Sequence, residues 1–284
     1  MNKIKIITDC TSDLTDDLYV EHDIHVMSLY VTIGEKNYRD KIDILPEEMF
    51  KLVDKYNTLP KTSALTPHDF NEVFGKYINE GYDVLFFGIG GGFSSTFQNA
   101  VIASREFPED RIRVLDSANL SSGIGLLLLK AAKFRDEGNT LAEIAAKIEA
   151  IVPNVRSMFS INTLEYLHKG GRCSGTQRFF GSMLKIKPII RVVDGKMIVG
   201  KKPRGKYKAA LDAQLEYVMH DIDNIDPDNL FITHCLAEDE DIEYLKEEIN
   251  KRININNIHV STASSTIATH CGPRTIGILY IVKE

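Results

Sequence analysis

The sequence predicts an α/β protein made of two domains. Through residue 153, short apolar runs rich in β-branched residues alternate with helix-forming segments, which is typical of a mostly parallel sheet covered by helices on both faces. Further on, Asp194-Gly195 separates two strand-like runs, which indicates a β-hairpin and therefore a mixed sheet. We expect residues 1–153 to form a three-layer α/β/α domain and residues 154–284 to form a second α/β domain. A chain of 284 residues can bury a core in each domain without disulfides or metals.

In the first domain, apolar runs give the strands and capping residues give the helix boundaries. Pro46 suits the first turn of a helix, and Thr66 can cap the next, with Pro67 at its first position. Thr140 and Glu143 have the spacing of a capping box. The expected strands span residues 3–8, 25–33, 83–89 and 111–115. The expected helices span residues 46–56, 66–80, 94–105, 121–137 and 140–152.

The second domain has a less regular alternation of elements. Asp194-Gly195 forms the turn of the hairpin, and residues 239–250 have the pattern of an acidic amphipathic helix. The expected strands span residues 157–161, 187–193, 196–200, 229–234, 258–262 and 276–282. The expected helices span residues 164–168, 207–221 and 239–250.

Charge and composition argue against several classes of protein. The 34 basic and 40 acidic residues give a net charge of −6, whereas a general nucleic-acid binder is normally basic. No apolar run approaches the ~20 residues that span a membrane, so no stable membrane insertion is expected. Asp9 comes too early for a signal peptide. The four cysteines form no CxxC pair and no recognised metal spacing, so we expect reduced thiols, no metal site and a cytoplasmic protein.

The first candidate site is the glycine-rich stretch Gly88–Gln98, between an expected buried strand and an expected helix. Glycines leave backbone N–H groups accessible, and a helix N-terminus carries a partial positive charge. With the hydroxyls of Ser94 and Thr96, this suits a phosphate or a carboxylate. Phe93 stands where a dinucleotide fingerprint needs glycine, and no Walker lysine follows. The alternative interpretation is a tight turn in which Ser94 only caps the helix.

Two other segments are expected at the same crevice, because loops after parallel strands converge at one edge of the sheet. Lys61-Thr62-Ser63 precedes the Thr66 cap, so Thr62 and Ser94 can face one ligand. Asp9–Asp13 follows the first strand. The alternatives are a solvated turn for Thr62 and a simple helix cap by Thr11 or Ser12.

The remaining candidates lie in the second domain. Two glycines precede Arg172, which suggests a loop that presents its guanidinium. His270 precedes a Gly-Pro turn. Taken alone, an isolated arginine or histidine is more often structural than functional.

Taken together, these motifs resemble those of the DegV family. The resemblance spans nearly the whole chain and rests on ordered segments, namely Ile7–Asp9, Lys61–Ser63, Phe93–Gln98, Val114–Ser117, Leu164–Gly175 and His270–Pro273. DegV proteins are bacterial fatty-acid-binding proteins that act as acyl-carrying subunits of fatty acid kinase in phospholipid metabolism. The resemblance implies an N-terminal α/β/α domain, a C-terminal α/β domain and a lipid held between them.

The resemblance also implies the residues of the lipid site. A threonine and a serine of the family hold the fatty-acid carboxylate, and they match Thr62 and Ser94. The family arginine and histidine match Arg172 and His270. Their neighbours complete the expected ligand-binding set: Ser63, Gly92 and Phe93. No metal and no cofactor beyond the bound long-chain fatty acid is expected.

The chain departs from the family pattern at several positions. Cys10 replaces a common serine, Gly90-Gly91 replaces a frequent Ser-Ser pair, and Ser95 replaces a glycine. Arg274 replaces the last glycine of the His-x-Gly-Pro-Gly pattern. Glycine at such a turn can adopt φ > 0, which arginine rarely does. The Thr62 and Ser94 pair is unaffected by these changes.

The physics of a fatty acid suits this arrangement. Each buried methylene contributes ~0.8 kcal/mol, so the acyl chain supplies much of the affinity. The carboxylate then needs donors, because an unpaired buried charge is costly. Neutral donors leave a carboxylate oxygen free to attack the γ-phosphate of ATP. We expect no catalysis by this chain alone, but acyl-phosphate formation with a fatty acid kinase catalytic subunit.

Two other functions are weighed against lipid binding. A hydrolase or acyltransferase would use Cys10 or Ser94 as nucleophile with His270 as base. The sequence has no Gly-x-Ser-x-Gly elbow and names no carboxylate partner for His270. A DNA-binding regulator is disfavoured by the acidic balance and the lack of a clear helix-turn-helix.

A basic segment offers a surface for the kinase. Residues 169–208 contain twelve lysines and arginines and one acidic residue, Asp194. Clustered charge accelerates the encounter with an oppositely charged partner. The resemblance implies that Arg204, beside Lys202, faces the kinase. The alternative is a solvated hairpin whose lysines protect exposed strand edges.

Overall fold

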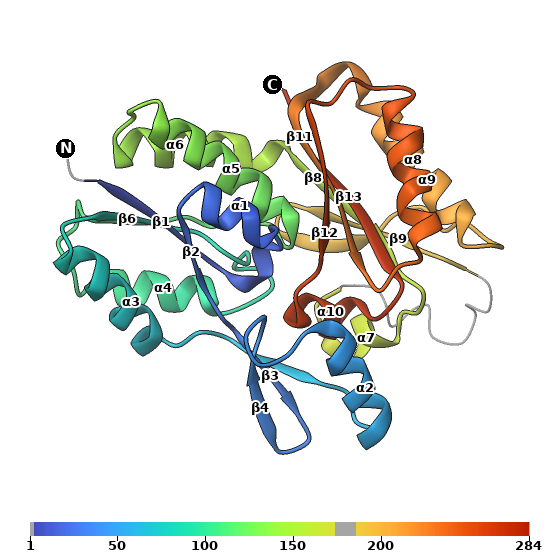
Figure 1. The fold of residues 1–284 in the computed structure, drawn as a ribbon, viewed down its shortest axis with the longest axis horizontal. Coiled ribbons are helices and arrows are strands. Elements are labelled where there is room, and N and C mark those ends of the chain that lie inside the picture. The colour runs from blue at the N-terminus through green and yellow to red at the C-terminus, as the bar shows by residue number, and fades with distance from the viewer. Residues whose placement is uncertain (1–2, 174–185, 284) are drawn as a thin grey trace.

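The computed structural model describes residues 3–173 and 186–283, and it has the predicted α/β architecture (Figure 1). A four-stranded parallel sheet forms in the N-terminal half (residues 3–153) and a six-stranded mixed sheet in the C-terminal half (residues 154–283). The fold class is therefore confirmed. The domain boundary near Pro153 stays a prediction, although every strand of the mixed sheet begins at Val155 or later.

The parallel sheet has the strand order β2-β1-β6-β7, with all neighbouring strands parallel. Its strands are β1 (Ile4–Asp9), β2 (Ile24–Met27), β6 (Asp83–Phe86) and β7 (Ile112–Val114). The side chains of each strand alternate between the two faces. Ile7 and Phe86 pack towards one layer of helices, and Ile6 and Leu85 towards the other. Both faces are therefore covered, as the apolar strands predict.

Helices α3 (Pro67–Asn79) and α4 (Thr96–Ser104) cover one face, and α5 (Ser122–Asp136) and α6 (Leu141–Ile151) cover the other (Figure 1). The capping boxes at Thr66 and Thr140 are both formed. The short helix α1 (Asp16–Glu21) was not expected from the sequence.

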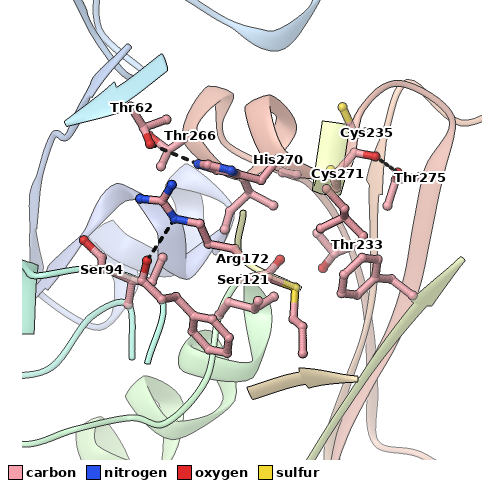
Figure 2. A pocket seen from close by; sticks show the side chains of 18 of the residues that line it. Thr62, Ser94, Ser121, Arg172, Thr233, Cys235, Thr266, His270, Cys271 and Thr275 are labelled. Atoms are coloured by element: carbon pink, nitrogen blue, oxygen red, sulfur yellow. Dashed lines mark hydrogen bonds between the residues drawn. The ribbon is translucent and has the colours of Figure 1, made fainter. Parts of the chain in front are cut away.

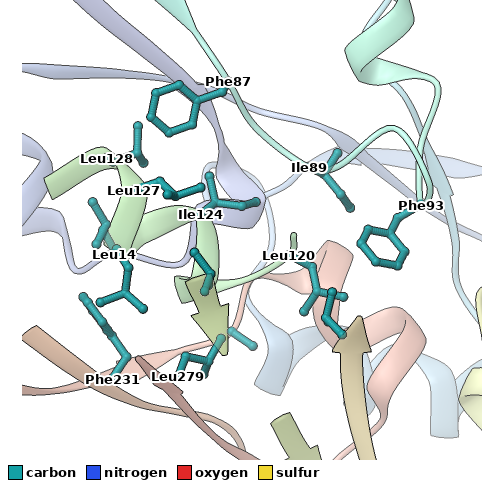
Figure 3. Packing of buried hydrophobic residues seen from close by; sticks show 14 of the residues in the cluster. Leu14, Phe87, Ile89, Phe93, Leu120, Ile124, Leu127, Leu128, Phe231 and Leu279 are labelled. Atoms are coloured by element: carbon teal, nitrogen blue, oxygen red, sulfur yellow. The ribbon is translucent and has the colours of Figure 1, made fainter. Parts of the chain in front are cut away.

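Helix α5 is shared by the two halves. Its run Leu126–Leu129 is buried on every side, as expected for a helix that is apolar all round. Figure 3 shows its residues Ile124, Leu127 and Leu128 between Phe87 on one side and Phe231 and Leu279 on the other. One continuous core therefore joins the parallel sheet to the mixed sheet.

The single strand expected over residues 25–33 is wrong, because the structure divides it between two sheets. Its first part is β2, and its second part, β3 (Tyr30–Ile33), joins a small antiparallel sheet of order β4-β3-β5. The other members are β4 (Lys36–Arg39) and β5 (Lys61–Ser63), neither of which was expected. Helix α2 (Pro46–Tyr56) begins and ends where the sequence predicts.

The mixed sheet has the order β10-β9-β8-β13-β11-β12, in which only β11 and β12 pair in parallel. Its strands are β8 (Val155–Ser160), β9 (Ile189–Val193), β10 (Lys196–Val199), β11 (Ile225–Cys235), β12 (Asn257–Thr262) and β13 (Thr275–Val282). The β9–β10 hairpin predicted from Asp194-Gly195 is present. Helices α8 (Lys208–His220) and α9 (Asp239–Asn250) cover the face opposite α5.

Two short helices lie near the junction of the halves (Figure 1). Helix α7 (Glu165–Gly170) was expected, and α10 (Ser265–Cys271) was not. The Ser264 hydroxyl caps α10 by accepting a hydrogen bond from the Ile267 N–H. Single-turn 3₁₀ helices span Cys10–Ser12, Val152–Asn154 and Ile222–Asn224. Within the two described ranges, no helix combines the length and apolarity needed to cross a bilayer.

Candidate ligand-binding site

A cavity of about 240 Å³ lies where the two halves meet, and both halves line it. Figure 2 shows Thr62, Ser94, Arg172 and His270 at one end, with Thr233, Cys235 and Thr275 towards the other. Its walls are mainly apolar between these polar groups. The apolar lining residues are Leu29, Ala64, Ile89, Phe93, Leu120, Phe159, Leu167, Met197, Ala263, Ile267 and Leu279. The cavity thus combines mainly apolar walls with a cluster of polar groups at one end and further hydroxyls towards the other.

Thr62 and His270 form a polar contact that joins the two halves in the cavity. Thr62 lies on β5 and His270 on α10, and their Oγ1 and Nε2 atoms are 3.0 Å apart. The two residues are 208 positions apart in the chain. Residues that the sequence analysis selected separately are therefore brought into direct contact by the fold.

His270 is held as a neutral imidazole. Burial, together with the neighbouring Arg172 guanidinium, lowers its pKa from 6.5 to about 4. Its Nδ1 is buried and has no hydrogen-bond partner among the described residues. That nitrogen faces Gly170, where an added Cβ would lie 2.4 Å from it. A buried ring nitrogen without a partner costs less free energy as an unprotonated acceptor than as an N–H donor. We therefore assign the imidazole proton to Nε2.

Arg172 is held by backbone carbonyl groups. Its Nη1 donates to the Gly170 carbonyl at 2.7 Å, and its Nε lies 3.4 Å from the Phe93 carbonyl. Among the cavity-lining residues that the structure describes, Arg172 is the one permanently charged side chain, and none carries a carboxylate. The electrostatic potential of the cavity therefore favours an anion.

Ser94 lies just outside the helix that it was expected to begin. Helix α4 starts at Thr96, and the Ser94 Oγ accepts a hydrogen bond from the Thr96 N–H at 3.2 Å. The same oxygen is 2.9 Å from the Thr96 hydroxyl. The Ser94 hydroxyl thus accepts from the start of α4 and also lines the cavity. Its position fits a role in capping the helix and a role in binding a ligand.

The glycine-rich loop does not offer an open row of N–H groups. Gly90 donates to the Asn119 carbonyl, Gly91 to the Asp116 carboxylate, and both Phe93 and Ser94 to the Gly90 carbonyl. The glycines instead permit close packing. A Cβ on Gly88 would lie 2.1 Å from the Asp9 carboxylate.

The smaller members of the expected ligand set are placed differently. Ser63 and Phe93 line the cavity beside Thr62 and Ser94. Gly92 is not among the described lining residues, and an added Cβ there would lie 2.2 Å from the Gly195 carbonyl oxygen. Gly92 thus supports the contact between this loop and the β9–β10 hairpin.

Cys10 is buried away from the cavity. Its Sγ accepts a hydrogen bond from the Leu29 N–H at 3.3 Å and lies 3.5 Å from the Asp40 carboxylate. Burial and two neighbouring carboxylates raise the pKa of this thiol well above its ordinary value. Such a thiol stays protonated, which makes it a poor nucleophile. Asp9 is equally buried and caps the 3₁₀ turn through the Thr11 N–H.

Several polar residues of the cavity were not predicted from the sequence. Thr233 lines it from β11, and its hydroxyl lies 2.5 Å from Ser122 and 2.8 Å from Ser261. Thr266 lines it from α10, one turn before His270. The Ser264 cap is the one local signal for this helix, and it is too weak to predict seven helical residues by itself.

The predicted partner-binding residues lie on the surface. Lys202 and Arg204 are exposed, in the connection between β10 and α8. Several other cations of the basic segment form local ion pairs: Lys169 with Glu165, Lys201 with Glu216, and Lys208 with Asp212. Arg178 and Lys185 lie outside the described residues. These neighbouring carboxylates therefore offset part of the positive potential of the segment.

Arg274 adopts the left-handed backbone conformation that its family position suggests for glycine. Its φ is +59°, and Gly272 has φ of +78°. The Arg274 carbonyl accepts a hydrogen bond from the Tyr207 hydroxyl, and its guanidinium is 3.4 Å from Glu238. These contacts stabilise the turn that follows His270.

Comparison with known proteins places the chain in a family. A family model described as "Uncharacterised protein, DegV family" matches residues 3–283. A DegV domain-containing protein of Clostridium acetobutylicum is 35% identical over 288 residues, covering 100% of both chains.

Solved structures share the fold. A DegV family protein of Thermus thermophilus, described by its fatty acid binding, has a TM-score of 0.92 and 31% identity, covering 99% of this chain and 100% of the other. A stearic-acid-binding protein of Eubacterium ventriosum has a TM-score of 0.85 and 26% identity, covering 100% and 99%. With its fold, its ordered motifs and these matches over its whole length, the chain belongs to the DegV family.

Proposed function

We propose that this protein binds a long-chain fatty acid in the cavity between its two halves. One observation carries the proposal: a cavity with mainly apolar walls has hydroxyls, a neutral imidazole and an arginine at one end, and none of its described lining residues is acidic. The fatty acid binding described for the Thermus and Eubacterium proteins supports the same ligand. The apolar walls take the acyl chain, which contributes ~0.8 kcal/mol per buried methylene.

The carboxylate is held by Ser94 and Thr62. With its N–H at Nε2, His270 donates a hydrogen bond to the Thr62 Oγ1. The Thr62 hydroxyl can then donate its own hydrogen bond to the ligand. His270 then orients Thr62, and Ser94 supplies a second neutral donor. Arg172 adds positive charge nearby, although the Phe93 and Gly170 carbonyls restrain its guanidinium. Ser63 and Phe93 complete this end of the cavity, and Gly92 supports the loop behind it.

The protein presents this carboxylate to a fatty acid kinase catalytic subunit for phosphorylation to acyl phosphate. Hydroxyl donors leave an oxygen lone pair available for attack on a γ-phosphate, whereas a bidentate arginine would occupy both oxygens. The chain is then a lipid carrier and is not catalytic alone. Lys202 and Arg204 are exposed on the surface that the kinase would contact.

Covalent catalysis by this chain is the weaker candidate. The Cys10 thiol is buried outside the cavity lining. Ser94 is hydrogen-bonded to Thr96, and His270 to Thr62. The His270 Nδ1 faces Gly170, so no described carboxylate orients the ring as a general base.

Ligand extraction tests the proposal directly. Mass spectrometry of an organic extract of the purified protein should find a fatty acid close to one equivalent. Ser94→Ala and Thr62→Val should each weaken palmitate binding by about 5- to 100-fold, since each removes a donor from a buried anion at ~1–3 kcal/mol. Ser104→Ala is the matched control, because this α4 hydroxyl only donates to the Val101 carbonyl. Unchanged affinity in both site variants would reject the carboxylate assignment.

The kinase partnership needs a separate test. Lys202→Glu combined with Arg204→Glu should leave palmitate binding intact, while acyl-phosphate production with the kinase falls and loses its salt dependence. Lys36→Glu, on the exposed strand β4, is the control for a general change of charge. Acyl phosphate formed from ATP by the purified protein alone would reject the non-catalytic role.

A further inference from the structure

Helix α10, which carries His270, is attached to the N-terminal half by buried carboxylates. Asp40 and Asp13 are both fully buried. Asp40 accepts hydrogen bonds from the Ser265 N–H at 2.8 Å and the Thr266 N–H at 2.7 Å. Asp13 accepts one from the Ser264 N–H at 2.8 Å. Three successive N–H groups at the start of α10 are therefore bound by side chains from the other half of the protein.

These hydrogen bonds satisfy donors at the start of α10 that the helix itself cannot satisfy. The first N–H groups of a helix have no partner within the helix, and a carboxylate there also interacts with the helix dipole. An oxygen that accepts from such an N–H group removes the cost of leaving a buried donor unpaired. Because Asp40 binds two of the N–H groups, its carboxylate fixes both the position and the rotation of the first turn.

The same small sheet contacts α10 again at its other end. Asp40 directly follows β4, and its N–H donates to the Leu29 carbonyl just before β3. Thr62 lies on β5, which pairs with the other edge of β3. The sheet β4-β3-β5 thus reaches α10 at Thr266 through Asp40 and at His270 through Thr62.

The two attachment points are one helical turn apart. Residues i and i+4 lie on the same face of a helix, about 6 Å apart along its axis. A displacement or rotation of the first turn therefore moves the His270 ring by a similar amount. A hydrogen bond of 3.0 Å between Nε2 and Oγ1 does not tolerate a shift of 1 Å.

We infer that Asp40 is a positioning residue for the head-group site, which sets the Thr62–His270 contact by anchoring α10 to the small sheet. It touches neither the cavity nor the ligand, because it is absent from the described lining residues. The consequence for affinity rests on the proposed function, in which the oriented Thr62 hydroxyl binds the carboxylate. The effect on the His270 ring does not depend on any ligand.

The test combines a ring measurement with a binding measurement. Asp40→Asn keeps the size and shape of the side chain, but it replaces one carboxylate oxygen by an NH₂ group, which cannot accept from the Ser265 or Thr266 N–H. In protein labelled with ¹⁵N-histidine and freed of lipid, the His270 ring signals of Asp40→Asn should move towards those of Thr62→Val. The titration midpoint of the ring should rise towards that of an ordinary histidine. Palmitate affinity should fall about tenfold.

Two further variants make the outcome decisive. Asp43→Asn, at an exposed position that pairs with Arg39, should change neither readout. Ser265→Pro keeps the Asp40 carboxylate but removes the Ser265 N–H that donates to it. Proline is tolerated there because Ser265 is the first residue of α10. This variant should shift the ring signals and lower the affinity in the same direction as Asp40→Asn, but less. If Asp40→Asn does not fold, Ser265→Pro alone decides.

Wild-type ring signals in Asp40→Asn and Ser265→Pro would overturn the positioning role, even if stability falls. If the wild-type protein fails to bind palmitate but the ring signals shift as expected, the proposed function fails and the role of Asp40 stands.

Discussion

Gly170 leaves room for the His270 ring because it has no Cβ. The residue ends α7, and its Cα lies against the Nδ1 face of His270. Its neighbour Gly171 has open space around it but a φ of +66°. The two adjacent glycines thus serve different purposes, close packing in one case and backbone conformation in the other.

Substitution of these glycines separates the two purposes. Gly170→Ala places a Cβ 2.4 Å from the His270 Nδ1, so it should push the ring away from Thr62 and weaken palmitate binding about tenfold. Gly171→Ala should instead lower the free energy of unfolding by about 1 kcal/mol, since alanine is strained at positive φ, without changing affinity. Titration with palmitate and urea unfolding measure the two effects. Equal affinities for the two variants would contradict the steric account.

The depressed pKa of His270 gives a second prediction, with a definite sign. The pKa is about 4 in the folded protein against an ordinary value of 6.5. Folding therefore disfavours the protonated ring, so stability is complete above pH 6.5 and falls as the pH drops towards 4. At pH 5 this amounts to about 2 kcal/mol. His270→Gln should lose correspondingly less stability between pH 7 and pH 5.

The comparison between variants isolates this histidine. Burial raises the pKa of Asp13 to about 7. This group therefore adds stability at low pH, and that contribution is lost as the pH rises through 7. Because wild type and His270→Gln both contain Asp13, its contribution cancels in the comparison. His68→Gln, at an exposed position on α3, is the matched control for replacing a histidine by glutamine. An unchanged slope in His270→Gln, measured by urea unfolding at both pH values, would refute the buried neutral ring.

At the scale of elements, the loop before α4 and the β9–β10 hairpin depend on each other. Gly92 contacts the carbonyl of Gly195 at the hairpin turn, and the hairpin supplies Met197 to the cavity wall. The loop also supplies Phe93 and Ser94. The contact between two turns thus holds two walls of the cavity together.

Gly92→Ala should disturb this contact. Its Cβ would lie 2.2 Å from the Gly195 oxygen, which forces the two turns apart and should cost about 1–3 kcal/mol of stability. Gly75→Ala is the control, because its Cβ on α3 would meet Phe107 only at 3.8 Å. That change should stabilise the protein by about 0.5–1 kcal/mol through helix propensity. Thermal and urea unfolding distinguish the two, and a stabilised Gly92→Ala would disprove the close contact.

Elements with strong local signals could be predicted from the sequence, and those made by tertiary contacts could not. Helices α2 and α9 begin and end where their caps and periodicity indicate. Helix α10 has seven residues and takes its stability from Asp40 and Asp13, which are over 200 positions away. The three-residue strand β5 exists because β3 pairs with it.

The site shows the same division. Thr62, Ser94, Arg172 and His270 could be selected from motifs, and the fold brings all four to one cavity. The division of residues 25–33 between two sheets could not be predicted, because both parts are equally apolar and β-branched. Thr233 could not be identified because its role depends on hydroxyl contacts with Ser122 and Ser261, on other elements.

At the scale of the whole molecule, an ion-pair network joins α5 of the N-terminal half to the start of β11 in the C-terminal half. Lys130 on α5 lies 2.7 Å from Asp226 and 2.9 Å from Asp228, both on β11. The lysine side chain is only 12% exposed. Lys133 also reaches Asp228 at 3.2 Å but is 54% exposed.

The two lysines should differ sharply in their contribution. Lys130→Met leaves two partly buried carboxylates without their main partner and should cost about 2–4 kcal/mol of unfolding free energy. Lys133→Met should cost about 0.5 kcal/mol or less, as is typical of an exposed pair. Urea unfolding at low and high salt measures both. Similar losses of unfolding free energy in the two variants would show that Lys130 contributes no more than an exposed ion pair does.

The position of β13 in its sheet has a consequence for the order of events during synthesis. Every residue of Thr275–Val282 is buried, and the strand lies between β8 and β11. All strands of the parallel sheet are translated by Val114, so that sheet can form while the ribosome is still working. The mixed sheet must wait for β13, and with it the cavity residues Gly277 and Leu279. Until then its apolar faces are open to chaperones or to aggregation, and the cavity lacks the part of its wall that β13 supplies.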